Sequence, residues 1–394
     1  MIFHNSKSSL DKDKTRPKIC LLAATALTIH FFFKPHLLEL SKHYDVTLAL
    51  NPANDCYLPD LALPLEITSV DIARKISLGQ DCVALFQLLK LFQSQKFDLL
   101  ITVVPKAGLL GMIAAFVVGI PRRLHIFQGE VWASKSGLSR LVLKLADRVT
   151  ATLATHVLAV SESECQFLIK EGIVSANKIS VLGTGSICGV NLERYHPRNK
   201  TEINEARKNF GIPEDAIVVI FLGRLVPDKG INEFADACRG LEKSCPQLWI
   251  LLVGPDEEGV VELVLERLGE IKNRTKVFGF TSEPEKFIAA ADFICLPSHR
   301  EGFGVVIIEA GSMGLPAIGS RIYGVSDAII DRKTGLLFEK GDILQLRTAI
   351  SEFYSNESLR LQYGLAAQNY AAESFSSQEV VKRYIQYIHK LFNF

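Results

Sequence analysis

Short apolar runs alternate with longer amphipathic segments along most of this 394-residue chain. Apolar runs of about four to eight residues bounded by turn residues are typical of buried parallel strands, and the amphipathic segments between them are typical of covering helices. Seven strands are predicted in the first half, at 18–24, 45–50, 66–68, 99–103, 123–127, 156–159 and 179–182. Six more follow, at 217–222, 248–253, 276–278, 293–296, 316–319 and 335–338.

The segments between the strands predict helices at 34–43, 72–95 and 137–155, and a closing helix at 378–394. Two further helices are expected to begin near Ile231 and Val305. The longest apolar stretch, Ala107–Ile120, is shorter than the ~18–20 residues that cross a bilayer. We therefore expect a buried helix there and not a membrane span.

A polar, proline-containing run at 189–202 separates the two sets of strands. The chain is also longer than one hydrophobic core usually supports. We expect a flexible tail at 1–16, a first domain at 17–190, a linker at 191–202, a second domain at 203–377 and the closing helix at 378–394. Each domain is expected to be a Rossmann-like α/β unit with a doubly wound parallel sheet. Ligands of such sheets bind at the carboxyl ends of the strands, where we expect the two domains to face a central cleft.

The cysteines and the distribution of charge bear on the cellular compartment and on the kind of binding partner. The eight cysteines include no C-x-x-C pair, and most lie in apolar segments, which favours reduced core cysteines and a cytoplasmic protein over a zinc site. The amino terminus lacks the apolar run of a signal peptide. Residues 1–200 hold 23 Lys and Arg against 16 Asp and Glu, a net charge of +7, whereas the remainder carries −6. This asymmetry favours an anionic partner for the first half, although scattered solvated charges explain it equally well.

The stretch VVIFLGRLVPDKG, at 218–230, places Gly223, Arg224 and Lys229 just after a strand. Glycine lets a phosphate approach the backbone, and the two cations neutralise its charge. The pattern is not a Walker loop, because G-x-x-x-x-G-K-[ST] does not occur in the chain. A phosphate site and an ordinary strand–turn–helix with solvated cations both remain open.

The stretch SHREGFGVVIIEAGSMGLPAIGS, at 298–320, places two carboxylates, Glu301 and Glu309, eight positions apart. Gly302 and Gly304 near the predicted helix start expose backbone N–H groups, which bind anions. A carboxylate about one turn into the helix can accept hydrogen bonds from the vicinal hydroxyls of a ribose. The alternative is a capping carboxylate followed by an exposed helical glutamate.

These motifs occur in an order that resembles the retaining glycosyltransferases of family 4, which have the GT-B fold. The resemblance rests on GRLVPDKG, FGFTSEPEKFIAAADFICLPS, the Glu301-x7-Glu309 spacing and IYGVSDAIIDRKTGLLFEKGD, and covers nearly the whole second domain. In the first domain, TVVPKAGLLGMIAAFVVGIPRRLHIFQGEVW, ATHVLAVSESECQFLIKEGI and SVLGTGSICGVNLERYHP look like one bacterial branch of the family. That branch adds sugars to lipid-linked oligosaccharides or surface polysaccharides.

The resemblance implies roles for individual residues of the second domain. Arg224 and Lys229 would hold the donor diphosphate, and Glu301 would face the reacting hexose; these three are the predicted catalytic residues. Glu309 would bind the ribose. The remaining predicted donor contacts are Gly223, Phe280, Thr281, Gly302, Phe303, Gly304 and Val305, with the N–H groups of 303–305 on phosphate or sugar and 279–281 beside the base.

The acceptor side departs from the family pattern. The segment Ala23–Thr28 stands where many members have a Gly-Gly loop, and Gln128-Gly129-Glu130 stands where many have a His-Gly pair. We predict Thr28, Gln128, Gly129 and Glu130 as acceptor-binding residues. His125 lies in an apolar strand, so we interpret it as a core histidine.

The resemblance implies transfer of a hexose or N-acetylhexosamine from a UDP-sugar, with retention of configuration, to a glycan acceptor that is lipid-linked or soluble. No cofactor, metal ion or nucleic-acid partner is expected. The alternatives are a non-hydrolysing UDP-sugar epimerase, a glycogen-type glucan synthase and a non-catalytic sugar-nucleotide-binding protein. A dinucleotide-dependent oxidoreductase is disfavoured, because 182–188 supplies G-x-G without the third glycine of G-x-G-x-x-G.

A polyprenyl-linked acceptor would bring the protein to the inner face of the cytoplasmic membrane as a peripheral protein. Six cations lie at the start of the candidate acceptor strand or after it: Arg122, Arg123, Lys135, Arg140, Lys144 and Arg148. Leu138, Leu141, Val142 and Leu145 are interleaved with them. The segment predicts either a basic amphipathic surface for anionic lipid headgroups, or a helix whose leucines face the core.

Overall fold

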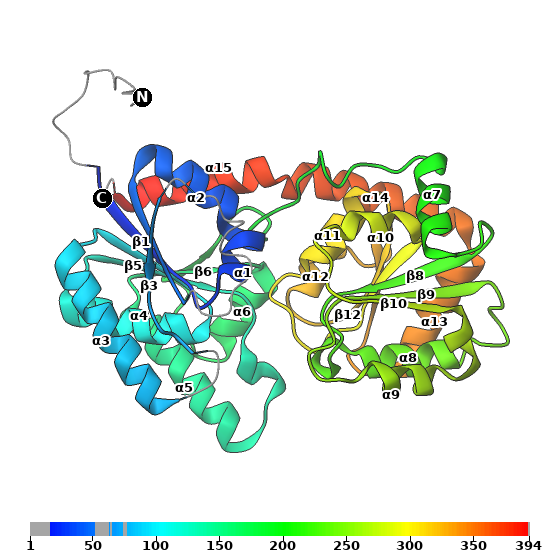
Figure 1. Cartoon of the computed structure of the whole chain (residues 1–394), viewed down its shortest axis with the longest axis horizontal. Coiled ribbons are helices and arrows are strands. Elements are labelled where there is room, and N and C mark those ends of the chain that lie inside the picture. The colour runs from blue at the N-terminus through cyan, green and yellow to red at the C-terminus, as the bar shows by residue number, and fades with distance from the viewer. Residues whose placement is uncertain (1–15, 52–62, 64, 74–76, 393–394) are drawn as a thin grey trace, which may run out of the picture. The chain divides into compact units, whose positions relative to one another are not determined.

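The computed structural model describes residues 16–51, 63, 65–73 and 77–392, and these residues form two parallel β-sheets covered by helices (Figure 1). The first sheet has the strand order β3-β2-β1-β4-β5-β6-β7. Its strands are β1 (Lys18–Leu22), β2 (Asp45–Leu50), β3 (Glu66–Ser69), β4 (Leu99–Val103), β5 (Arg122–Phe127), β6 (His156–Ala159) and β7 (Ile179–Val181). Ile19 of β1 pairs in parallel register with Val46 of β2 and Leu99 of β4.

Helices connect these strands, as parallel pairing requires. They are α1 (Ala26–Thr28), a π-helical turn (Ile29–Phe33), α2 (Lys34–His43), α3 (Leu78–Gln95), α4 (Pro105–Val118), a 3-10 turn (Val131–Ser134), α5 (Gly137–Leu153) and α6 (Glu162–Lys170). The long apolar stretch forms α4, whose residues from Ala107 to Ala115 are mostly buried. No helix among the described residues combines the length and the apolar character needed to cross a membrane.

The second sheet has the order β10-β9-β8-β11-β12-β13. Its strands are β8 (Ile217–Leu222), β9 (Leu248–Val253), β10 (Thr275–Phe278), β11 (Phe293–Leu296), β12 (Ala317–Ser320) and β13 (Gly335–Phe338). β8 and β9 read IVVIFL and LWILLV and are almost wholly buried, as expected for parallel strands covered on both faces. Helices α8 (Ile231–Arg239), α9 (Val261–Leu268) and α13 (Ile343–Ser355) cover one face of this sheet (Figure 1).

The other face of the second sheet carries α7 (Lys200–Phe210), α10 (Pro284–Ala290), α11 (Val305–Ser312) and α14 (Glu357–Phe375) (Figure 1). The short helix α12 (Val325–Ala328), 3-10 turns at Pro227–Lys229 and Gly269–Arg274, and the closing helix α15 (Ser377–Phe392) complete the described elements. The direction of strand addition reverses between β8 and β11. The loops after these two strands therefore leave the sheet side by side at its carboxyl edge, where ligands of doubly wound sheets bind.

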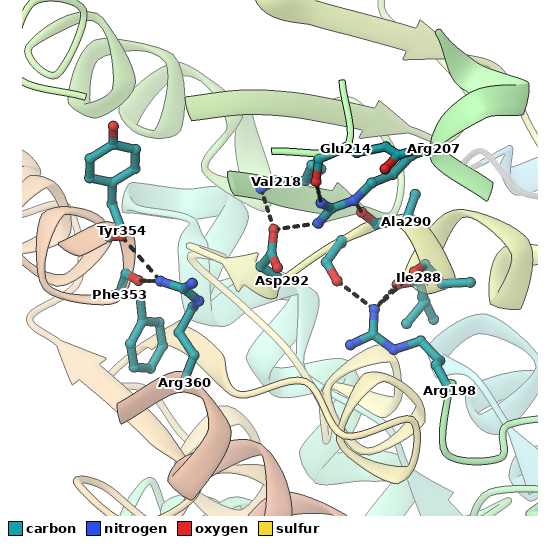
Figure 2. A network of polar contacts seen from close by, with 12 residues as sticks. Arg198, Arg207, Glu214, Val218, Ile288, Ala290, Asp292, Phe353, Tyr354 and Arg360 are labelled. Carbon is teal, nitrogen blue, oxygen red and sulfur yellow. Dashed lines mark hydrogen bonds and ion pairs between the residues drawn. The ribbon is translucent and has the colours of Figure 1, made fainter. Parts of the chain in front are cut away.

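Three arginines, of which Arg207 and Arg360 are buried and Arg198 is partly buried, donate hydrogen bonds at the ends of helices in the second sheet's layer (Figure 2). Arg198 donates to the carbonyls of Ile288, Ala289 and Ala291, and Arg207 to that of Ala290, at the carboxyl end of α10. Arg207 also pairs with Asp292 at 2.8 Å. Arg360 donates to the last carbonyls of α13. Helix ends leave such carbonyls unpaired, and the positive charge suits their partial negative charge.

The structure confirms the predicted strands to within about two residues and corrects several helix limits. The helix expected over 72–95 begins at Leu78: Ile72 is buried in non-helical backbone, and 74–76 lie outside the described residues. α5 ends at Leu153, and the Thr155 N–H donates to the Arg123 carbonyl at 2.8 Å instead of continuing the helix. α7 begins inside the expected linker, where Asn199 and Glu202 form a capping box. Residues 1–15 of the expected tail and 393–394 of the closing helix lie outside the described residues.

The described residues group into two compact units. One consists of residues up to His125 with Leu153–Thr155, and the other of 126–152 with 156–392. The expected domain limits at 190 and 203 stay a prediction, although the change of sheet does fall between β7 and β8. Among the cysteines that the structure describes, all are unpaired and Cys82 alone is exposed.

Candidate active site

The loop after β8 presents Gly223 and Arg224 at the carboxyl edge of the second sheet. Gly223 has φ 148°, and a Cβ there would meet no protein atom within 4 Å, so open space adjoins its backbone. Arg224 Nη1 lies 3.0 Å from Glu257 Oε2, and both side chains are 41% exposed. An exposed ion pair contributes little and yields readily to a charged ligand. The loop thus offers bare backbone and an available cation.

Lys229 and Glu301, from the loops after β8 and β11, meet directly. Lys229 Nζ lies 2.5 Å from Glu301 Oε1, and the Ser298 hydroxyl donates to the same oxygen at 2.8 Å. The two charged side chains are only 18% and 14% exposed. Gly230 permits this approach: with φ 74°, a Cβ there would lie 1.9 Å from the Pro297 carbonyl oxygen. A side chain at 230 would force the two loops apart.

Further contacts fix the loop that carries Glu301. The His299 N–H donates to the Asp228 carbonyl at 3.0 Å, and Arg300 Nη2 lies 3.2 Å from the Asp228 carboxylate. His299 Nε2 lies 2.9 Å from Glu233 Oε1 on α8. That hydrogen bond raises the pKa of His299 and lowers the pKa of Glu233. The loop that carries Glu301 is therefore held by several contacts to the segment from Asp228 to Glu233.

The helix α11 begins where the sequence predicted, at Val305, after Gly304 with φ 76°. Its first N–H groups have no partner within the helix, as in any helix, and the amino end carries partial positive charge. Phe303 is 4% exposed, and its ring packs edge-on against Phe375 at 5.1 Å. The Phe303 side chain therefore anchors the turn, which leaves its backbone for ligand contacts.

Glu309 lies on α11 with its carboxyl surrounded by protein groups. The Tyr195 hydroxyl donates to it, and Arg194 lies near. Burial raises the pKa of Glu309 to about 7, although the Tyr195 hydrogen bond and the Arg194 charge act in the opposite direction. Arg194 also donates to Glu285 Oε2 at 2.6 Å and to the Ser282 carbonyl. From the sequence, Tyr195 and Arg194 were expected in a linker, because no local pattern shows that they contact residues as distant in the chain as Glu309.

Phe280 and Thr281 follow β10 at the same edge of the sheet. Phe280 is 50% exposed, and the Thr281 hydroxyl accepts the Glu283 N–H at 3.0 Å. A half-exposed aromatic ring at a sheet's ligand-binding edge offers an apolar face to a planar ring.

The structure brings the predicted acceptor segment against the Glu301 turn. A Cβ on Gly129, which has φ 90°, would lie 2.8 Å from the Gly302 nitrogen, and one on Gly302 would lie 2.7 Å from the Gln128 carbonyl carbon. Two glycines are therefore needed where these backbones touch. The Glu130 carboxyl, in contrast, is 1% exposed and enclosed by protein groups.

Two predicted positions lie in the other compact unit. Thr28 ends α1 after β1, and its N–H approaches the Thr25 hydroxyl at 3.5 Å. His125 is 1% exposed, and its Nδ1 lies 2.7 Å from the Thr102 hydroxyl. Burial lowers the pKa of His125 to about 3, so it is the neutral core histidine that the sequence indicated.

Known proteins resemble this chain over both halves. The model "Glycosyl transferases group 1" matches residues 202–370, and "Glycosyl transferase 4-like domain" matches 38–185. The capsular polysaccharide biosynthesis glycosyltransferase CapM of Staphylococcus aureus is 31% identical over 312 residues, which are 78% of this chain and 81% of CapM. The chain belongs to the group 1 glycosyltransferases. This membership confirms the resemblance drawn from the motifs.

Two other proteins resemble this glycosyltransferase. The UDP-Gal:alpha-D-GlcNAc-diphosphoundecaprenol alpha-1,3-galactosyltransferase of Escherichia coli is 32% identical over 278 residues, covering 69% of this chain and 70% of that protein. The crystal structure of Anabaena HepE in complex with UDP and glucose superposes with a TM-score of 0.77 at 22% identity, over 95% of this chain and 99% of HepE. The glycosyltransferase therefore has the GT-B fold.

The described residues of this glycosyltransferase contain no group of three or more His, Cys, Asp or Glu side chains placed to hold a metal ion. Lys229 and Glu301 meet at the carboxyl edge of the second sheet, where Arg224 follows β8, and Glu309 lies on α11 beside Tyr195. The sequence singled out these four charged residues but not Ser298, Arg300 and Tyr195, which contact them or the neighbouring backbone.

Proposed function

We propose that this glycosyltransferase moves a hexose or N-acetylhexosamine from a UDP-sugar, with retention of configuration, to a polyprenyl-diphosphate-linked sugar during polysaccharide or oligosaccharide assembly. The observation that carries the proposal is the meeting of Lys229 and Glu301 beside the start of α11, at the switch point of the second sheet. The names of the relatives support the substrates. The E. coli relative is named for a UDP-galactose donor and a diphosphoundecaprenol-linked acceptor, and HepE was crystallised with UDP and glucose.

Each part of the donor has a candidate partner in this arrangement. The diphosphate binds Arg224, Lys229 and the N–H groups of 303–305, and the open space at Gly223 admits it to the backbone. Glu309 accepts hydrogen bonds from the ribose hydroxyls, and Phe280 lies beside the base. Glu301, whose carboxylate is oriented by the Ser298 hydroxyl, accepts a hydrogen bond from a hydroxyl of the hexose.

The proposed reaction proceeds on one face of the sugar. The bond between the anomeric carbon and the β-phosphate oxygen breaks, and the electron pair stays on the diphosphate. The acceptor hydroxyl attacks from the same face and gives its proton to a β-phosphate oxygen, so that the products are the glycoside and UDP. Negative charge grows on the diphosphate as the bond breaks, and Lys229, Arg224 and the amino end of α11 stabilise it. Because these groups supply positive charge, we propose that no metal ion is needed.

We further propose that α5 rests on the anionic surface of the cytoplasmic membrane that holds such an acceptor. Leu138, Leu141, Val142 and Leu145 recur at helical spacing, and each is more than half exposed, between 53% and 75%. The alternative that these side chains face the core is therefore wrong. Arg140 and Lys144 pair with Glu171 at 3.1 and 2.6 Å, whereas Lys135 and Arg148 are exposed at the two ends of the apolar face. An apolar face flanked by cations suits an anionic headgroup layer.

A substrate panel tests the proposal. The purified protein is incubated with single UDP-sugars and with polyprenyl-diphosphate-linked acceptors or their soluble analogues, and UDP release and glycolipid formation are measured. We expect one UDP-sugar and a lipid-linked acceptor to give product, with no product when the acceptor is omitted. Product with free glycans that lack a diphosphate, and none with the polyprenyl-diphosphate-linked acceptors or their analogues, would contradict the lipid-linked assignment. No product from any pair would contradict the proposal.

A further inference from the structure

Glu164 on α6 holds the ends of two strands with one buried carboxyl. Its Oε1 accepts the Gly129 N–H at 2.5 Å, and its Oε2 accepts the Val160 N–H at 2.8 Å. Gly129 follows β5 and Val160 follows β6, so the carboxyl fixes the place where the segment 128–130 leaves the sheet. The Ser161 hydroxyl accepts the Glu164 N–H at 3.1 Å and caps the helix that carries this side chain. Glu164 itself is 0% exposed.

Gly129 in turn contacts the turn that carries Glu301. Its carbonyl accepts a hydrogen bond from Arg300 Nη1 at 3.2 Å, and its Cα faces the Gly302 nitrogen too closely for any side chain. Arg300 and Gly302 are the two neighbours of Glu301. A shift of Gly129 therefore displaces the reacting carboxylate from Lys229.

A second carboxyl, that of Glu130, lies against the first. It is 1% exposed and faces the Glu164 carboxyl from α6 and the Tyr323 hydroxyl from the loop after β12. The other charged groups around it are Asp147 from α5 and Arg300 from the loop after β11. Two carboxylates in one buried site repel each other too strongly for both to ionise, so one of them keeps a proton.

We propose that Glu164 and Glu130 share one proton and thereby position Gly129 against the turn that carries Glu301. Both are positioning residues, because they act on the reacting groups through Gly129. For the Glu130 side chain this replaces the direct acceptor contact expected from the sequence. The kinetic test of the pair rests on the proposed glycosyl transfer, whereas the titration tests described below need no substrate.

Burial supports the shared proton. Burial raises the pKa of Glu130 to about 7, and the negative charge of Asp147 adds to this shift. Burial also raises the pKa of Glu164 well above its usual range, and the charge of Glu130 adds to that shift. An unfolded glutamate ionises near pH 4.3. Between that pH and about 7, the folded protein holds a proton that the unfolded chain has lost. Stability contributed by the pair is thus full at low pH, falls as pH rises through this window and levels off above the folded pKa.

Kinetics of two variants test the positioning role. In Glu130→Gln the new amide donates to the Glu164 carboxylate at every pH, so we expect the alkaline fall of kcat to move upward by about one pH unit or more. In Glu164→Gln an amide NH₂ group opposes one of the two backbone N–H groups. We expect kcat to fall about tenfold or more while KM for the UDP-sugar changes less than about twofold. The reason is that the substitution displaces Glu301 but leaves the residues that contact the nucleotide in place. Glu162→Gln, on the exposed side of the same helix, is the matched control and should behave as wild type.

Two measurements without substrate complete the test. Urea unfolding at a series of pH values from 5 to 8 gives the number of protons bound on folding, and we expect wild type to bind about one more than Glu130→Gln near pH 6. Carbon-13 NMR of wild-type protein labelled at the glutamate carboxyls needs no variant to fold, and should show two carboxyls that titrate near pH 7, that of Glu309 and one from the pair.

The outcomes separate the two proposals. An unchanged pH profile and proton count in Glu130→Gln, with every wild-type glutamate carboxyl except that of Glu309 titrating below about pH 5, would overturn the shared proton whatever the activity. A second carboxyl that titrates near 7 and the loss of one folding-linked proton, in a protein that turns over no UDP-sugar, would support the pair and contradict the proposed function.

Discussion

At the scale of single residues, Lys229 carries the largest expected effect. Its ammonium group lies 2.5 Å from Glu301. In the proposed reaction it stabilises the departing diphosphate, whose charge grows in the transition state. Lys229→Ala should therefore lower kcat about a hundredfold, or ~3 kcal/mol at the transition state, and change UDP affinity much less. Steady-state kinetics at saturating donor measures this. Lys286→Ala removes an exposed lysine that also forms an ion pair and should leave kcat unchanged; wild-type kcat in Lys229→Ala would exclude its role.

The two glutamates eight positions apart should respond differently to truncation. Glu309→Ala should chiefly weaken donor binding, because a ribose contact is made equally in the ground state and the transition state. Glu301→Ala should chiefly lower kcat, because its carboxylate lies beside Lys229 at the reacting sugar. Calorimetric titration with UDP and kinetics at saturating donor separate the two effects. Equal losses of UDP affinity and equal residual kcat in both variants would contradict this division.

At the scale of secondary-structure elements, the exposed apolar face of α5 leads to a prediction about binding to anionic membranes. The protein should float with anionic liposomes at low salt and separate from them at high salt, because salt screens the attraction. Lys135→Gln with Arg148→Gln should weaken flotation more than Arg140→Gln with Lys144→Gln, since the latter two cations are already paired with Glu171. Each exposed cation contributes about 1 kcal/mol. Protein that stays unbound at low salt would end the membrane proposal.

Elements with a strong local signal could be predicted from the sequence, and those set by distant contacts could not. β8, β11 and the start of α11 are marked by buried apolar runs and by glycines, and all three lie where expected. The start of α3 and the capping box of α7 depend on where a single capping residue lies, which the apolar pattern does not reveal. The outward face of α5 stayed open, because a pattern of leucines and cations does not say which side meets the core.

The same limit applies to side chains that act together. Lys229, Glu301 and Glu309 each lie within a sequence motif that marks them as candidate site residues. Tyr195, which donates to Glu309, and Glu164, which holds Gly129, acquire their roles only when segments far apart in the chain meet. The sequence therefore predicts candidate reacting groups but not the residues that contact and orient them.

At the scale of the whole molecule, we propose that the loops at one edge of the second sheet supply the positive charge that a metal ion would otherwise supply. In this proposal Arg224, Lys229 and the amino end of α11 stabilise the diphosphate. We predict that turnover persists in excess EDTA and does not rise when magnesium or manganese is added back. A rate that EDTA abolishes and magnesium restores, in protein purified free of metal, would contradict this prediction.

The central claim is retention of configuration in sugar transfer from a UDP-sugar to a lipid-diphosphate-linked acceptor. Its most direct test is the anomeric configuration of the product, determined by proton NMR of the purified glycolipid made from an α-linked UDP-sugar. We expect an α-glycoside from the wild-type protein and, in the same time, about a hundredfold less of it from Lys229→Ala. A β-glycoside would contradict retention, and the absence of any glycolipid across the whole panel of UDP-sugars would contradict the proposed function.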